Sequence, residues 1–196
     1  VAHAGEIIGL AGLAGHGQTD LLLATFAAAS NMRAGARVDA LVALVAGDRQ
    51  SDGVFPGWSI GHNIGVRSLK KLRSGPLLSI RLEDELANAW RDRIKIRTPD
   101  IHNNILSLSG GNQQKALFAR ALASDARIML MDDPMRGVDF GTKLAVYALI
   151  RAEAHRGRPF LWYPTATEDL NNCHRPPVLR DGATAPPLAP APPTPA

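Results

Sequence analysis

The chain has 196 residues, of which 45% are hydrophobic, and its formal net charge is +4 at pH 7. This length is typical of one domain with a substantial buried core. A small net charge and an aromatic content of 5% argue against nucleic-acid binding, which favours a clustered basic face or stacking rings. The single cysteine, Cys173, excludes a disulfide within the chain. The sequence contains no run that approaches the roughly 18 apolar residues needed to span a membrane.

A short apolar segment, a glycine-rich loop and a helical segment follow one another at the start of the chain. Residues 5–12 (GEIIGLAG) predict a buried parallel strand, and residues 19–30 (TDLLLATFAAAS) predict a helix with Leu22, Phe26 and Ala29 on one face. The N-terminus of such a helix presents N–H groups and the positive end of a dipole to an anion. The arrangement suits phosphate binding.

The loop itself, GLAGHGQTD at residues 12–20, is close to the phosphate-binding pattern G-x-x-x-x-G-K-[ST]. Thr19 stands where a hydroxyl reaches Mg²⁺, but Gln18 replaces the lysine that neutralises the phosphates. Taken alone, the loop leaves two interpretations open: a nucleotide site, and a glycine-rich turn without a ligand.

The middle of the chain predicts a strand at residues 41–46 and an amphipathic helix within residues 77–96, with Trp90 in the core. One basic run, RSLKKLR at residues 67–73, is interpreted as a solvated helix face, with an anionic partner or a lipid surface as the alternative.

Residues 106–139 carry the most informative order of motifs. Ser109 can cap a helix, and Gly110 and Gly111 let the start of that helix approach a ligand closely. An apolar strand at residues 128–131 then ends in two acids, where an α/β sheet binds its ligand. The first acid suits Mg²⁺ binding through water, and the second suits the orientation or activation of a water molecule.

With these motifs in this order, the chain resembles the ATP-binding subunits of ABC transporters, and among them the importers of ribose, xylose and similar sugars. LSGGNQQK (108–115) resembles the signature motif, IMLMDDP (128–134) Walker B and RGVD (136–139) the D-loop. GLAGHGQTDLL (12–22) resembles Walker A of the second, degenerate nucleotide-binding domain that such importers carry.

The resemblance implies an α/β fold of the P-loop NTPase type, with a mostly parallel sheet flanked by helices and a small helical subdomain near residues 56–107. The ATP-binding domain is expected to span residues 1–182 and to be truncated at its N-terminus, because the chain starts at Val1 without a methionine. Residues 183–196 are rich in proline and are expected to form a disordered tail.

The resemblance also assigns site residues, which fall into four sets. The nucleotide-binding set is Gly12, Gly15, Gly17, Gln18, Thr19 and Asp20. The signature set is Ser109, Gly110, Gly111, Asn112 and Gln113. The D-loop contributes Gly137 and Asp139. Thr19 and Asp132 are the Mg²⁺ residues, and Asp133 is the catalytic acid.

The implied function is that of an ABC-type ATPase, which uses ATP and Mg²⁺ to energise carbohydrate import at the cytoplasmic face of the bacterial inner membrane as a peripheral subunit. The implied partners are a second nucleotide-binding domain packed head to tail, membrane-spanning permease subunits and, indirectly, a periplasmic sugar-binding protein. Nucleic acid is not an expected partner.

The chain's own site departs from the family pattern and is predicted to be degenerate. Gln18 is neutral, and Asp133 is one methylene shorter than the family's glutamate. Pro164 replaces a histidine or serine, and Gly47 stands where a glutamine or glutamate belongs. Three alternatives therefore stay open: an inactive nucleotide-binding regulatory module, a defective fragment of such a subunit, and a non-transport ABC ATPase that acts on nucleic acid.

Overall fold

The computed structural model describes residues 2–13, 15–30, 40–48, 53–135, 138–164, 166–180 and 183–185. Its centre is a parallel sheet with the strand order β1-β6-β5-β2. The strands are β1 (Ile7–Gly9), β2 (Val42–Val45), β5 (Ile128–Asp132) and β6 (Phe160–Tyr163). The two strands predicted near the N-terminus are therefore present, each shorter than its predicted range.

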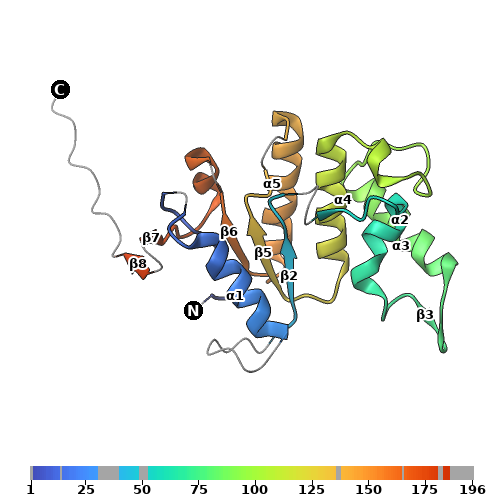
Figure 1. The fold of residues 1–196 in the computed structure, drawn as a ribbon, viewed down its shortest axis with the longest axis horizontal. Helices are drawn as coiled ribbons and strands as arrows, with labels where there is room; N and C mark the ends of the chain where they lie inside the picture. The colour runs from blue at the N-terminus through green and yellow to red at the C-terminus, as the bar shows by residue number, and fades with distance from the viewer. Residues whose placement is uncertain are drawn as a thin grey trace.

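Helices cover both faces of this sheet, with α1 (Gln18–Ser30) on one and α4 (Gly110–Ala123) and α5 (Phe140–His155) on the other (Figure 1). Alternation along β5 explains why both faces are apolar, because successive side chains point to opposite sides of a sheet. Leu130 packs in the cluster that includes Leu22 of α1, whereas Met129 and Met131 pack in the cluster that includes the apolar residues of α4 and α5.

The predicted apolar face of α1 is confirmed. Leu22 is fully buried, and Phe26 and Ala29 are partly buried against the same cluster.

A second group of short elements lies beside α4, away from the sheet (Figure 1). It contains α2 (Ile60–Gly65), the 3₁₀ helices η2 (Val66–Ser68) and η3 (Ile105–Ser107), the hairpin β3 (Arg73–Ser74) and β4 (Leu77–Leu78), and α3 (Ile80–Arg93). The predicted helix within residues 77–96 is confirmed as α3, and Trp90 is buried in the core as expected. A separate subdomain with boundaries at 56 and 107 remains a prediction.

The basic residues of the run 67–73 are exposed, as the interpretation of a solvated face requires, but the predicted helix is wrong, because only Val66–Ser68 is helical, as η2. Arg67 lies in η2 and its Nη2 donates to the carbonyl of Val42 at 2.9 Å. Lys71 lies in a turn, where its Nζ donates to the carbonyl of Ala123 at 2.7 Å. These two cations hold backbone carbonyl groups of β2 and α4, so tertiary contacts decide the local structure.

The predicted start of the disordered tail is also wrong. Residues Ala183–Ala185 form β8, which pairs antiparallel with β7 (Val178–Arg180). Backbone hydrogen bonds between two strands require no particular side chains, so this hairpin could not be predicted from the composition of the segment. Residues 186–196 of the predicted tail lie outside the described part of the chain.

The 3₁₀ helix η4 (Thr167–Asn172) precedes this hairpin, and the segment between them runs beside β1. Leu179 donates its N–H to the carbonyl of Ala11 at 2.7 Å, which ties the hairpin to the loop after β1. Within the described ranges, none of the helices combines the length and the apolar composition that a membrane crossing requires.

Candidate functional site

The loop that links β1 to α1, residues 10–17, is called the glycine loop below. Gly12, Gly15 and Gly17 have φ values of 142°, 86° and 93°. An L-amino-acid side chain is strained at such angles, so glycine is required for this backbone path. The predicted phosphate-binding glycines therefore shape the loop that ends at the first turn of α1, beside the carboxyl end of β1.

Gln18 turns back against this loop and is only 1% exposed. Its Nε2 donates to the carbonyl of Leu13 at 3.1 Å, and a Cβ on Gly12 would lie 2.6 Å from the same nitrogen. The amide thus binds a carbonyl of the loop and brings no positive charge. Its predicted contact with phosphate, like those of Asp20 and the loop glycines, remains a prediction.

Thr19 and Asp132 meet at the carboxyl edge of the sheet, although they are 113 positions apart in the sequence. The hydroxyl of Thr19, in the first turn of α1, donates to Oδ1 of Asp132 at 3.0 Å, and Asp132 ends β5. Burial raises the pKa of Asp132 and the nearby Asp133 adds to the rise, whereas the hydrogen bond from Thr19 opposes it. A hydroxyl and a carboxylate side by side fit Mg²⁺, which takes oxygen ligands and keeps several waters.

The raised pKa of Asp132 makes a prediction about stability and pH. A carboxyl group whose pKa is raised by folding destabilises the fold once pH exceeds its unfolded pKa, because the folded state then binds more protons. Asp132→Asn removes the charge and keeps an acceptor for Thr19. At neutral pH and without nucleotide, we expect the variant to melt on the order of 2 °C higher than the wild type.

The melting-temperature difference between Asp132→Asn and the wild type should shrink as pH falls from the raised folded-state pKa toward the ordinary carboxyl pKa of about 4, and should vanish below it, where the carboxyl is protonated in both states. Thermal melts followed by circular dichroism between pH 3.5 and 7.5 measure it. A difference that stays constant over this range would mean that the charge of Asp132 is not the cause.

Asp133, the predicted catalytic acid, follows β5 with a φ of 37°. Few residues other than glycine adopt a positive φ, and such positions recur at functional sites. Its N–H donates to the carbonyl of Tyr163 at 2.7 Å. Because Tyr163 pairs with Asp132 and precedes Pro164, two of the predicted departures from the family pattern lie at this one corner.

Gly47, the third departure, belongs to the same place. A Cβ at this position would lie 2.7 Å from the carbonyl oxygen of Asp132 and 3.7 Å from Cβ of Asp133. A glutamine or glutamate here would require the backbone after β2 or β5 to shift. The absence of a side chain at residue 47 therefore allows the segment after β2 to lie close to the end of β5.

The signature residues lie at the start of α4, which covers the face of the sheet opposite to α1. Ser109 occupies the N-cap position, but its side chain makes no capping hydrogen bond, so the predicted cap is wrong. Instead its Oγ accepts from Nδ2 of Asn112 at 3.0 Å, and Oδ1 of Asn112 accepts from the N–H of Arg97 at 3.0 Å. Gln113 is buried, and its Nε2 donates to the carbonyl of Leu108 at 3.0 Å.

These contacts give Asn112 and Gln113 a local role, since they fix the backbone that precedes α4. The first turn of the helix keeps N–H groups without intrahelical partners, and Ser109 is exposed. Since α1 and α4 cover opposite faces of the sheet (Figure 1), the chain does not bring its signature residues to its own glycine loop.

Of the two predicted D-loop residues, Gly137 lies outside the described part of the chain. Asp139 is the N-cap of α5, and its Oδ1 accepts from the N–H of Thr142 at 3.0 Å. This hydrogen bond is the main reason why the pKa of Asp139 lies below its ordinary value. A Cβ on Gly111 would lie 3.0 Å from Oδ2 of Asp139, so the structure brings the signature and the D-loop acid together.

Sequence reasoning missed two arginines near the Thr19–Asp132 pair. Arg67 and Arg120 line a cavity of about 480 Å³ together with Thr19, Asp132 and Phe55. Burial lowers the pKa of Arg120 to about 10, and the positive charge of Arg67 adds to the effect. An arginine among the apolar residues of ALFARALA was the available signal, because such a residue must find acceptors inside the protein.

A parallel sheet, a glycine loop before a helix and a threonine–aspartate pair at the carboxyl edge define a nucleotide-binding fold of the P-loop type. The family described as ABC transporter matches residues 2–136. The chain therefore belongs to the ABC transporter family.

Two relatives with described functions show what the chain is similar to. "Ribose import ATP-binding protein RbsA 1" of Mesorhizobium japonicum is 35% identical over 92% of this chain and 38% of its own length. "Xylose import ATP-binding protein XylG" of Paraburkholderia xenovorans is 36% identical over 78% of this chain and 32% of its own length. The chain thus spans no more than about two fifths of the length of these relatives.

Solved structures confirm the fold. A dimeric ATP-binding cassette in a post-hydrolysis state, bound to ADP and Pi, matches 94% of this chain and 85% of its own with a TM-score of 0.78 and 19% identity. A metal-chelate type ABC transporter in an inward-facing conformation matches 93% of this chain and 72% of its own with a TM-score of 0.75. At these identities the likeness shows the ABC cassette fold, as predicted.

Proposed function

We propose that the chain is an ATP-binding domain of an ABC importer for sugars, and that it couples ATP binding and hydrolysis to carbohydrate uptake. The hydrogen bond between Thr19 and Asp132 carries this proposal, because it places a hydroxyl and a carboxylate where the glycine loop meets the end of a buried strand. The two relatives named for ribose import and xylose import support sugar as the transported class.

At the chain's own site, bound Mg²⁺ would supply positive charge against the phosphates of ATP, and Thr19 and Asp132 would hold it. Three features weaken hydrolysis there. Gln18 brings no charge and its amide binds the loop. Gly47 has no side chain to place near the phosphates, and Pro164 has no N–H and no polar side chain. We propose that this site binds nucleotide and hydrolyses it slowly at best.

The signature serves a different ATP in this proposal. The start of α4 offers backbone N–H groups and the positive end of the helix dipole to an anion, which stabilises a γ-phosphate as charge develops on it. In a head-to-tail pair, residues 109–111 would face the Walker A loop of a second nucleotide-binding domain. This contribution requires no lysine at position 18.

The remaining partners follow from the same proposal. Membrane-spanning permease subunits would receive the conformational change, and a periplasmic sugar-binding protein would deliver the sugar to them. The chain would then act as a peripheral subunit at the cytoplasmic face of the bacterial inner membrane. The selected sugar would be decided by those partners.

Nucleotide binding by the purified chain tests the Thr19–Asp132 site. Thr19→Ala removes the hydroxyl from the Mg²⁺ position, and we expect the Kd for ATP with Mg²⁺ to rise about tenfold, the cost of a hydrogen bond to a charged group. Isothermal titration calorimetry with and without EDTA measures it, and the difference should vanish in EDTA. Thr25→Ala is the matched control, because Thr25 lies on the same helix and its hydroxyl binds the carbonyl of Leu21. Equal affinities for all three proteins would contradict the site.

A further inference from the structure

We propose that Glu153 is a positioning residue for the signature. It holds the C-terminal ends of α3 and α4 against α5, and so fixes the direction in which residues 109–111 point. The inference rests on the proposed role of the signature at a partner's ATP site.

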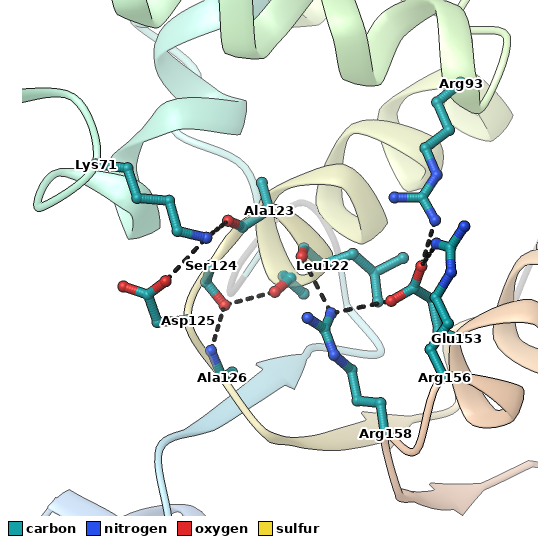
Figure 2. A network of polar contacts seen from close by, with 11 residues as sticks. Lys71, Arg93, Leu122, Ala123, Ser124, Asp125, Ala126, Glu153, Arg156 and Arg158 are labelled. Carbon is teal, nitrogen blue, oxygen red and sulfur yellow. Dashed lines mark hydrogen bonds and ion pairs between the residues drawn. The ribbon is translucent and has the colours of Figure 1, made fainter. Parts of the chain in front are cut away.

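Glu153 is the centre of a network of ion pairs (Figure 2). Its side chain is only 6% exposed and contacts the guanidinium groups of three arginines. Arg93 donates from the end of α3, and Arg156, the residue after α5, donates at 2.6 Å. Arg158 lies 3.5 Å away, two residues before β6. A buried carboxylate without partners destabilises a fold, and the three cations around Glu153 offset this cost.

Arg158 connects Glu153 to the signature helix. Its Nη1 donates to the carbonyl of Leu122 at 3.1 Å, and Nζ of Lys71 donates to the carbonyl of Ala123 at 2.7 Å (Figure 2). Both carbonyls belong to the last turn of α4, where no intrahelical donor is available. Cations at the C-terminal end of a helix also interact favourably with its dipole. The base of α4 is therefore held by two side chains from outside the helix.

The other end of α4 also lies against α5. Gly111 approaches the N-cap of α5 so closely that a Cβ would lie 3.0 Å from Asp139 and 3.2 Å from Oγ1 of Thr142. Contacts at both ends fix the tilt and the axial position of one helix on the other. The close contact at Gly111 leaves little clearance, so a shift at the base of α4 must move the signature.

Glu153 also joins α3 to this arrangement. The guanidinium of Arg93 lies 4.5 Å from the ring centre of Trp90, a core residue of the same helix, which orients Arg93 toward Glu153. One carboxylate thus links α3 directly, and α4 through Arg158, to α5. The neutral isostere glutamine keeps the volume of this side chain and weakens both attachments.

The test uses the complete transporter with an intact partner site. Glu153→Gln should lower kcat for ATP about tenfold, because a misplacement of about 1 Å can cost roughly 10²-fold. The KM for ATP should change less than about twofold, since the partner's own loop binds the ground state. Glu85→Gln is the charge-matched control, because Glu85 pairs with Arg81 on the exposed side of α3.

A stability control separates positioning from a merely structural role. Leu72→Ala removes a buried side chain that is 3% exposed and belongs to none of these contacts. Assayed at temperatures equally far below their melting points, Leu72→Ala should keep the wild-type kcat and Glu153→Gln should not. Equal kcat values for these two variants would overturn the proposal.

Arg158→Gln provides an independent test, because Glu153 then keeps Arg93 and Arg156 and the fold is spared. It should lower kcat, and the double variant should be no worse than Glu153→Gln alone, since the contact with Arg158 is one of the two attachments that Glu153→Gln already weakens. If Glu153→Gln does not fold, Arg158→Gln alone tests the role of Glu153, and a wild-type kcat for Arg158→Gln overturns the proposal.

Gly110→Asp separates the role of Glu153 from the proposed role of the signature. If it abolishes turnover and the Glu153 and Arg158 variants do not lower it, only the role of Glu153 fails, and if it too is tolerated, the proposed signature role fails.

Discussion

Gly110→Asp should suppress ATP hydrolysis at the partner's site by roughly two to three decades in the reconstituted transporter. Gly110 is the first residue of α4, so an aspartate there would place a carboxylate at the helix end proposed to face a γ-phosphate. Repulsion between like charges 4 Å apart, at an effective dielectric near 20, is about 4 kcal/mol. Each 1.36 kcal/mol changes the rate about tenfold.

Gln18→Ala is the matched variant for Gly110→Asp, because it changes only the chain's own loop. The loss of the Gln18 amide removes the hydrogen bond to the carbonyl of Leu13, and it should alter the turnover of the transporter less than about threefold. ATP hydrolysis and sugar uptake are both measured, and circular dichroism verifies that each variant folds. Loss of turnover in Gln18→Ala together with a tolerated Gly110→Asp would reverse the division of labour and defeat the degenerate-site proposal.

Trp162→Ala should be the most destabilising of the substitutions considered. Trp162 lies in β6, is completely buried, and packs with its ring centre 5.8 Å from that of Tyr147. Truncating a buried tryptophan to alanine costs about 3–5 kcal/mol, a large part of the roughly 5–15 kcal/mol that stabilises a typical domain. Within the described residues its Nε1 has no hydrogen-bond partner, so the loss is one of packing alone.

Trp58→Ala is the control for Trp162→Ala. Trp58 is 42% exposed and stacks on Phe55 with ring centres 4.6 Å apart, a contact worth about 0.5–1.5 kcal/mol. Urea denaturation followed by circular dichroism gives the free energy of unfolding for both variants. A smaller loss for Trp162→Ala than for Trp58→Ala would show that β6 is not central to the core.

Contiguous patterns explain what could be predicted from the sequence. The glycine loop, the S-G-G helix start and the strand that ends in two aspartates are each specified by neighbouring residues. Local backbone preferences and apolar periodicity act over the same short range. The strands β1, β2 and β5, the apolar face of α1 and the burial of Trp90 followed from them, and the structure confirms each. The α/β class followed from the family resemblance and is confirmed as well, whereas β6 was not predicted.

Contacts between distant segments were decided only by the tertiary structure. Gly47 lies so close to the carbonyl of Asp132 at the end of β5 that a side chain would clash there, and Gln18 turns back to bind the carbonyl of Leu13. The carbonyl groups of the last turn of α4 accept hydrogen bonds from Lys71 and Arg158, which lie far away in the chain. The sequence does not show whether a charged side chain will contact a backbone carbonyl or an ion-pair partner, because those groups come from other segments of the fold. The burial of Glu153 could therefore not be predicted from the sequence, since it depends on elements that pack against α5 from elsewhere in the chain. The basic run is exposed as predicted, but the carbonyl groups that it contacts in β2 and α4 come from distant segments.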